Sequence, residues 1–201
     1  MKRAATLCLA AACFLSAGAA QASNISWSYH FVSSGHNTHF ITNHHAFGFV
    51  NLPGNGSGHL STAEGATTDI STRIRSFSTA SASNPQTVNI PFAIDLKITD
   101  KASGLSEFVS FAGTLNGNIW NNGSTLQAHF SSPLTASLDI DHHVFTVSFE
   151  SFKAPGGAGH PGNFTFDVKT SHNPEPSSLV LAALGVPFFG LTLRHRRRRV
   201  G

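Results

Sequence analysis

Cysteine is nearly absent from this chain, and its placement excludes whole classes of chemistry. The 201 residues contain two cysteines, Cys8 and Cys13, and both precede residue 23. If residues 1–22 are a cleaved leader, the mature chain has neither a thiol nor a disulfide. A cysteine nucleophile and a cysteine-ligated metal are therefore excluded for the mature protein.

Charge is also scarce, and most of the positive charge lies at the two ends. Of the 13 basic residues, 7 are Lys2, Arg3 and five arginines near the C-terminus. Residues 23–172 hold six basic and nine acidic side chains, a net charge of −3. This central part lacks the basic surface that nucleic-acid binding requires, so we expect no nucleic-acid partner.

Helical periodicity and catalytic signatures are missing from the central part. Between residues 23 and 172 no apolar stripe recurs at helical spacing, and neither HExxH nor GxSxG occurs. These motifs are typical of zinc proteases and serine hydrolases. We therefore expect neither an enzymatic activity nor a cofactor.

The central part has instead a strict alternation of apolar and polar residues. A period of two places every second side chain on one face of a half-buried strand. Phe, Val, Ile and Thr, which favour a pleated surface, dominate these runs. The apolar positions are Ile25/Trp27/Tyr29/Phe31, Val88/Ile90/Phe92/Ile94/Leu96/Ile98, Val109/Phe111/Leu115/Ile119, Leu134/Ala136/Leu138/Ile140, Phe145/Val147/Phe149 and Phe164/Phe166/Val168.

Turn-forming clusters separate these runs, for example "LPGNGSG" at 52–58 and "APGGAGHPGN" at 154–163. About eight or nine short strands at this spacing indicate an all-β fold. We expect an antiparallel β-sandwich or jelly-roll-like domain over residues 23–172, with a barrel as the alternative. Pro91 interrupts a strand pattern, which predicts an edge position or a bulge there.

The N-terminus, "MKRAATLCLAAACFLSAGAAQA", has the composition of a secretory signal peptide. Lys2 and Arg3 precede an apolar stretch, and Ala20 and Ala22 fit the small-x-small cleavage pattern. Signal peptidase would cut after Ala22, so that residues 1–22 form a signal helix that is removed. An uncleaved N-terminal anchor is the alternative.

The C-terminus, residues 173–201, combines three features in a fixed order. Pro174-Glu175-Pro176 precedes an apolar run that ends at Leu193, and a basic cluster follows: Arg194, Arg196, Arg197, Arg198 and Arg199. This arrangement resembles a PEP-CTERM sorting signal. The likeness is confined to about these 29 residues, with Asn173 and Pro187 as small departures.

The resemblance implies a route for the protein. Residues 177–193 would form a short transmembrane helix, and the arginines would hold the C-terminus in the cytoplasm by the positive-inside rule. The partner implied is an exosortase, a membrane-bound transpeptidase-like enzyme that would cut at Pro174, Glu175 and Pro176. The precursor would sit in the inner membrane of a Gram-negative-type bacterium. The mature protein would reach the envelope, the surface or an extracellular matrix.

Other interpretations of the tail are kept open. A permanent single-pass anchor is the main alternative. A glycolipid-anchor signal would end in apolar residues rather than arginines. A nucleic-acid-binding arm would not carry an apolar run ahead of its basic cluster.

Histidine is the abundant residue that suggests a metal. Imidazole and carboxylate ligands suit Zn²⁺ or Cu²⁺, but no fixed-spacing signature supports a site. Surface histidines are the plainer interpretation, so we expect at most weak metal binding. The candidate ligands fall in "HNTHFITNHH" and "DIDHH" and are His36, His39, His44, His45, Asp139, Asp141, His142 and His143.

The sequence therefore predicts an exported, non-enzymatic surface or matrix protein. One alternative is an extracellular module that binds a carbohydrate or a metal, with extracellular polysaccharide as a further partner. Exposed aromatic side chains would favour the carbohydrate form, although Trp27 and Tyr29 alternate with serines and so are expected in the core. A secreted hydrolase is the second alternative.

Overall fold

The computed structural model describes residues 23–32, 38–43, 46–52, 56–157 and 159–173. The predicted signal peptide, the Pro-Glu-Pro motif, the apolar run and the arginine cluster lie outside these residues. So do His36, His44 and His45, and the side chain of His39 is not described either. Within the described part, no helix is long and apolar enough to span a membrane.

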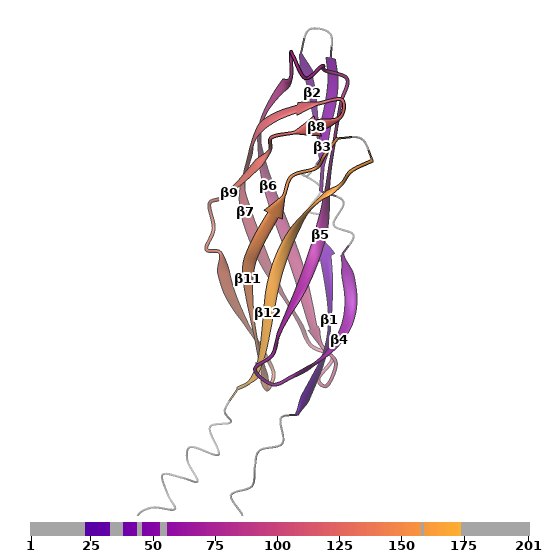
Figure 1. Cartoon of the computed structure of the whole chain (residues 1–201). Coiled ribbons are helices and arrows are strands. Elements are labelled where there is room, and N and C mark those ends of the chain that lie inside the picture. Colours follow the sequence, from indigo (N-terminus) through magenta and orange to yellow (C-terminus); the bar gives the residue numbers. More distant parts are fainter. Residues whose placement is uncertain (1–22, 33–37, 44–45, 53–55, 158, 174–201) are drawn as a thin grey trace, which may run out of the picture.

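Two antiparallel sheets, each of six strands, make up the described part of the chain (Figure 1). The first sheet has the order β4-β1-β6-β7-β8, and β9 also pairs with β7. Its strands are β1 (Asn24–Val32), β4 (Ser57–Ala63), β6 (Gln86–Asp100), β7 (Ser106–Trp120), β8 (Gly123–Ser124) and β9 (Gln127–Phe130).

The second sheet has the order β10-β11-β12-β5-β3-β2. Its strands are β2 (Thr38–Asn43), β3 (Ala46–Asn51), β5 (Thr67–Ser78), β10 (Thr135–Ile140), β11 (His143–Lys153) and β12 (Gly162–His172). The prediction of an all-β, sandwich-like antiparallel fold is confirmed. The two predicted flanking helices fall outside the described residues.

The core lies between the sheets and is built by the alternating positions. Trp27, Phe31, Phe111, Phe145, Phe164 and Phe166 are the largest fully buried side chains. Each inward row faces the other sheet, so Phe31 of β1 contacts Phe166 of β12 with ring centroids 5.8 Å apart. The period-two pattern therefore identified the buried face of these strands correctly.

Five predicted core positions differ from that pattern, since Leu134 is exposed and four others, Tyr29, Ile90, Ala136 and Phe149, are only partly buried. Leu134 is 48% exposed, because it lies in the turn before β10 rather than on the strand.

Pro91 lies opposite Thr114 of β7. Among the described residues the pairing of β1 with β6 ends at Val32 and Asp95, and residues 33–37 are not described. The expected edge or bulge position of Pro91 therefore stays a prediction.

Strand β5 was not among the predicted strands, although it is the longest in its sheet. Its inward row is Ile70, Thr72, Ile74, Ser76 and Ser78. Three of these five inward residues are hydroxylic, so the apolar alternation that revealed the other strands is weak here.

β1 begins and β12 ends at the same end of the elongated domain (Figure 1). Ser23 Oγ lies 3.0 Å from His172 Nε2, and this contact joins the two ends of the described domain. Strands β2, β3 and β8 lie at the opposite end. We refer to the end that contains Ser23 and His172 as the base.

Candidate functional site

The "DIDHH" segment forms a tight hairpin turn rather than a cluster of metal ligands. Ile140 pairs with His143, so Asp141 and His142 are the two turn residues, and Asp141 has a φ of 58°. A positive φ at this position is what a two-residue hairpin requires. Asp139 instead accepts hydrogen bonds from Asn173 Nδ2 at 3.2 Å. These four candidates therefore do not converge on one point.

Of these four candidates only His143 is buried, and it lies against a carboxylate from the other sheet. Its Nδ1 lies 3.2 Å from Asp100 Oδ1, and Asp100 is fully buried. The ring is within ion-pair distance but is not aligned for a hydrogen bond. Since Asp100 ends β6 and His143 begins β11, this contact joins the two sheets at the base.

The hydrogen-bond partners of the Asp100 carboxylate lie in the β6–β7 turn. The carboxylate accepts from Ala102 N at 3.2 Å, Ser103 N at 3.0 Å and Ser103 Oγ at 2.7 Å. Burial by itself raises the pKa of the Asp100 carboxyl, but the bonds from Ser103 and Ala102 and the nearby His143 outweigh it and lower the pKa. Asp100 is therefore held as a carboxylate.

This arrangement differs from a hydrolytic triad. The Ser103 hydroxyl donates to the carboxylate, not to the imidazole of His143. A nucleophilic serine needs its proton directed at a general base. The Asp100–His143–Ser103 group thus stabilises a turn and a sheet-to-sheet contact.

A second polar chain joins the sheets next to it. Trp27 Nε1 donates to Thr62 Oγ1 at 3.1 Å, and Thr62 Oγ1 lies 2.9 Å from Thr170 Oγ1. All three side chains are buried. This confirms the prediction that Trp27 is a core residue, and it leaves the indole unavailable to a ligand.

A group of carboxylates lies on the outer face of the second sheet. Asp69 pairs directly with Asp167, and with Glu150 their carboxylate oxygens lie within 4.8 Å of one another. Loss of hydration and the adjacent Asp69 raise the pKa of Asp167. Exposed carboxylate groups are common without a bound ion, so this group does not define a metal site.

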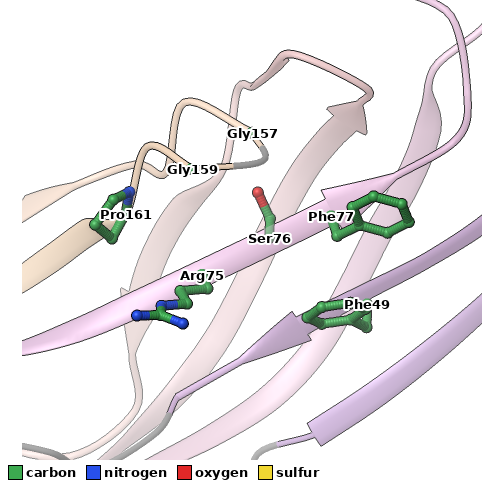
Figure 2. Close-up of a pocket in the computed structure, with 7 residues that line it drawn as sticks. All are labelled: Phe49, Arg75, Ser76, Phe77, Gly157, Gly159 and Pro161. Atoms are coloured by element: carbon green, nitrogen blue, oxygen red, sulfur yellow. The ribbon is translucent and has the colours of Figure 1, made fainter.

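Strand β5 changes its pairing partner halfway along, and a pocket forms at that point. Its pairing with β12 covers Thr67–Lys169 to Ile74–Gly162, and β3 pairs with it from Arg75 to Ser78. The glycine-rich loop that precedes Gly162 in the sequence does not pair with β5. The resulting depression of about 340 Å³, here called the β5 pocket, is lined by Phe49, Arg75, Ser76, Phe77, Gly157, Gly159 and Pro161 (Figure 2).

Two polar side chains of the β5 pocket, Arg75 and Ser76, have no partner among the described residues. Arg75 is exposed and has no carboxylate within 4.0 Å in the described part of the chain. Ser76 is 4% exposed, and its Oγ has no hydrogen-bond partner among the described residues. Figure 2 shows this hydroxyl pointing toward the loop of Gly157 and Gly159.

Two aromatic rings form the apolar wall of the pocket. Phe49 and Phe77 are directly opposite each other on β3 and β5, and their rings stack at 5.6 Å and 24°. Phe47, which is 43% exposed, lies 6.4 Å from Phe49 and extends this surface. Large aromatic side chains on an outward face are the feature expected of a binding surface.

The loop that forms the other wall is held in place by its own contacts. Gly156 N donates to His160 O at 2.8 Å, and Ser124 Oγ donates to Pro155 O at 2.5 Å. Gly157 has a φ of 92°, and a Cβ there would meet the carbonyl carbon of Asn122 at 2.6 Å. Only glycine fits, so the wall is preformed.

A second pocket of about 340 Å³ touches β5 two residues earlier. Arg73 lines it together with Tyr29, Gly56, Ser57 and Ser71. Arg73 is also exposed and without an ion pair among the residues described. Because its lining is mainly hydroxylic, this pocket lacks the stacked rings of the β5 pocket.

Sequence reasoning identified none of the β5 pocket residues. The signal available was the outward row of β5, in which Arg73, Arg75 and Phe77 alternate with Ile74 and Ser76. The alternation of β5 can be recognised in the sequence only if Ser76 and Ser78 are assigned to the inward face.

No protein-family model matches this chain, and neither a curated protein nor a solved structure is detectably similar to it. The class of protein is therefore defined by fold alone, as a sandwich-like all-β domain.

Proposed function

We propose that this chain is an exported, non-enzymatic protein of the cell surface or extracellular matrix. An exosortase would sort it and cut it at Pro174-Glu175-Pro176. The observation that carries the proposal is the order of the tail, in which the Pro-Glu-Pro motif, a short apolar run and five arginines follow one another. A membrane stop of this kind holds the chain, since each arginine costs about 2.5–3.5 kcal/mol at the bilayer centre.

The geometry of the domain is compatible with such a tail. Asn173, the residue before Pro174, is bound to the base by Asn173 N donating to His142 O at 2.7 Å. A membrane-held tail would therefore place the base next to the bilayer. The β5 pocket lies away from it, since the eight residue-to-residue rises of strand from Thr67 to Arg75 span about 26 Å.

The test is to follow processing of the full chain in a bacterium that has an exosortase. Alanine at Pro174, Glu175 and Pro176 together should leave the protein uncut and in the inner membrane. Alanine at the adjacent Ser177 and Ser178 is the matched control and should be processed normally. Recovery of peptides from residues 194–201 in surface-released protein would contradict processing and leave a permanent anchor.

A second candidate function is supported by the β5 pocket. We propose that the domain is also a carbohydrate-binding module, because stacked, half-buried aromatic rings border a preformed depression. Pockets of about 300–1,000 Å³ with an apolar wall and a few polar groups are typical ligand sites. A hydrolase is less favoured, because the Ser103 hydroxyl donates to Asp100 and not to His143.

A further inference from the structure

We propose that the β5 pocket binds a carboxylate-bearing sugar unit of an acidic polysaccharide. In this arrangement the Arg75 guanidinium pairs with the carboxylate, and the rings of Phe49 and Phe77 pack against the sugar ring. The inference rests on the proposed carbohydrate-binding function and names the chemistry of its ligand.

The anionic part of the ligand follows from Arg75. Its guanidinium has no carboxylate partner in the described part of the chain, and it borders the pocket beside the two rings (Figure 2). The planar, forked donors of arginine match a carboxylate in a two-bond geometry. A ligand carboxylate would supply the missing counter-charge.

The sugar part follows from the rings. A pyranose presents C–H groups on its faces, and these carry the slight positive charge that the negative face of an aromatic ring attracts. The rings of Phe49 and Phe77 are nearly parallel at 24° and stack with centroids 5.6 Å apart, so together they form an apolar surface beside Arg75. Phe47 continues this surface beyond a single ring.

The shape of the pocket favours a polymer over a small molecule. Small ligands are usually enclosed over about 70–90% of their surface. Here Arg75 is exposed and Phe49 and Phe77 are only half-buried, so the pocket is a depression open to solvent. A sugar unit within a chain can bind such a depression while its neighbours continue past it on either side.

The glycine loop gives the pocket a fixed wall. The Ser76 hydroxyl does not contribute a ligand contact, because it belongs to the inward row of β5, opposite Arg75 and Phe77, and is buried. The hydrogen bonds of Gly156 and Ser124 hold the loop before any ligand arrives, which lowers the entropic cost of binding.

General electrostatic attraction does not account for such binding. Residues 23–172 have six basic and nine acidic side chains, so the domain as a whole repels a polyanion. Binding must therefore depend on the local arrangement at Arg75. Arg73 offers a matched control, because it is also exposed, has no ion pair with a described residue, and lies on the same face of β5 two residues away.

The experiment measures binding of trigalacturonate to the purified full-length chain by calorimetry. The comparison probe is the same trisaccharide with methyl-esterified carboxylates, which keeps the sugar faces and removes the charge. We expect a dissociation constant below about 1 mM for the acid, a binding free energy stronger than about −4 kcal/mol. The ester should bind at least about tenfold more weakly, as expected for loss of a charge-assisted pair.

The variants then locate the site. Arg75→Ala should weaken binding of the acid by about tenfold or more, Arg75→Lys should restore part of it, and Arg73→Ala should change it by less than about twofold. Phe77→Ala should weaken acid and ester alike. Thermal melting of each variant confirms that it is folded, and Arg75→Gln replaces any alanine variant that is not.

Each other result overturns the inference in a distinguishable way. Equal losses for Arg73→Ala and Arg75→Ala would indicate diffuse electrostatics. Equal binding of acid and ester, lost in Phe77→Ala but not in Arg75→Ala, would keep a carbohydrate module and reject the acidic ligand. No binding of either probe would reject both, while the sorting proposal would still be judged on the tail variants.

Discussion

The base of the sandwich and the β5 pocket differ in how their charged side chains are partnered. At the base, Asp100 accepts three hydrogen bonds and contacts His143, and Thr62 links Trp27 to Thr170. At the pocket, Arg75 has no described counter-charge and Ser76 Oγ has no described partner. The contacts at the base stabilise the fold, whereas the exposed Arg75 remains available to a ligand.

The largest expected effect is loss of the Asp100 carboxylate. Asp100→Ala leaves the Ala102 and Ser103 donors without their acceptor inside the protein, and it removes the carboxylate beside His143. Removing one partner of a buried pair costs about 3–5 kcal/mol, so the free energy of unfolding should fall by about 3 kcal/mol. Urea denaturation measures it. Arg75→Ala is the comparison and should change stability by less than about 0.5 kcal/mol. Similar losses in both variants would remove the contrast between the two regions.

Low pH should reduce the stability that the Asp100 carboxylate contributes at the base of the sandwich. The pKa of Asp100 is lowered from its ordinary value near 3.8, so the unfolded chain binds this proton more readily than the folded one. The stability that Asp100 contributes is therefore complete above that value and is lost as the pH falls through the lower, folded pKa. Melting temperatures measured from neutral pH to about pH 2 should fall less steeply for Asp100→Asn than for the parent chain. Parallel curves would contradict this.

Two variants that each remove one buried hydroxyl allow the stability of the two regions to be compared. Thr170→Val removes a buried hydroxyl that bonds Thr62 across the sheets, and should destabilise the protein by about 1–2 kcal/mol. Ser76→Ala removes a buried hydroxyl with no described partner, so it should be neutral or slightly stabilising. Denaturant midpoints of the two variants give the answer. A loss in Ser76→Ala as large as that in Thr170→Val would show that Ser76 is satisfied in solution.

The smallest effect is expected on the outer face of the second sheet, between the two regions. Asp69 and Asp167 are directly opposite, and like charges at such a position are destabilising. Asp69→Asn should raise stability at neutral pH by a few tenths of a kcal/mol. Because the pKa of Asp167 is raised, the repulsion fades as the pH falls through that raised value, and the gain should fade with it. Ser71→Asn, on the same face, is the control.

The strand faces could be predicted from sequence wherever the inward row is apolar. In β6 the residues Val88, Phe92, Ile94, Leu96 and Ile98 are buried as their spacing indicates. In β5 the inward Thr72, Ser76 and Ser78 conceal the same period. The pocket depends on β5, so the candidate site could not be predicted, and the "DIDHH" residues that attracted attention form a hairpin turn.

By itself the sequence determined the local features of the chain, which depend only on residues close to one another in sequence. The alternation in runs such as Asn24–Val32 specifies a strand with one buried face, because side chains of a strand point to its two faces in turn. It also determined that no thiol follows Cys13 and that the arginine cluster follows an apolar run.

Only the tertiary structure decided which distant residues meet. Asp100 contacts His143 and Thr62 contacts Thr170 because β6 and β4 lie in one sheet and β11 and β12 in the other. Arg75 borders a pocket because β5 exchanges β12 for β3 at that residue. Pairing between strands depends on the register and packing of the whole sandwich, and those are properties that no local stretch of sequence contains.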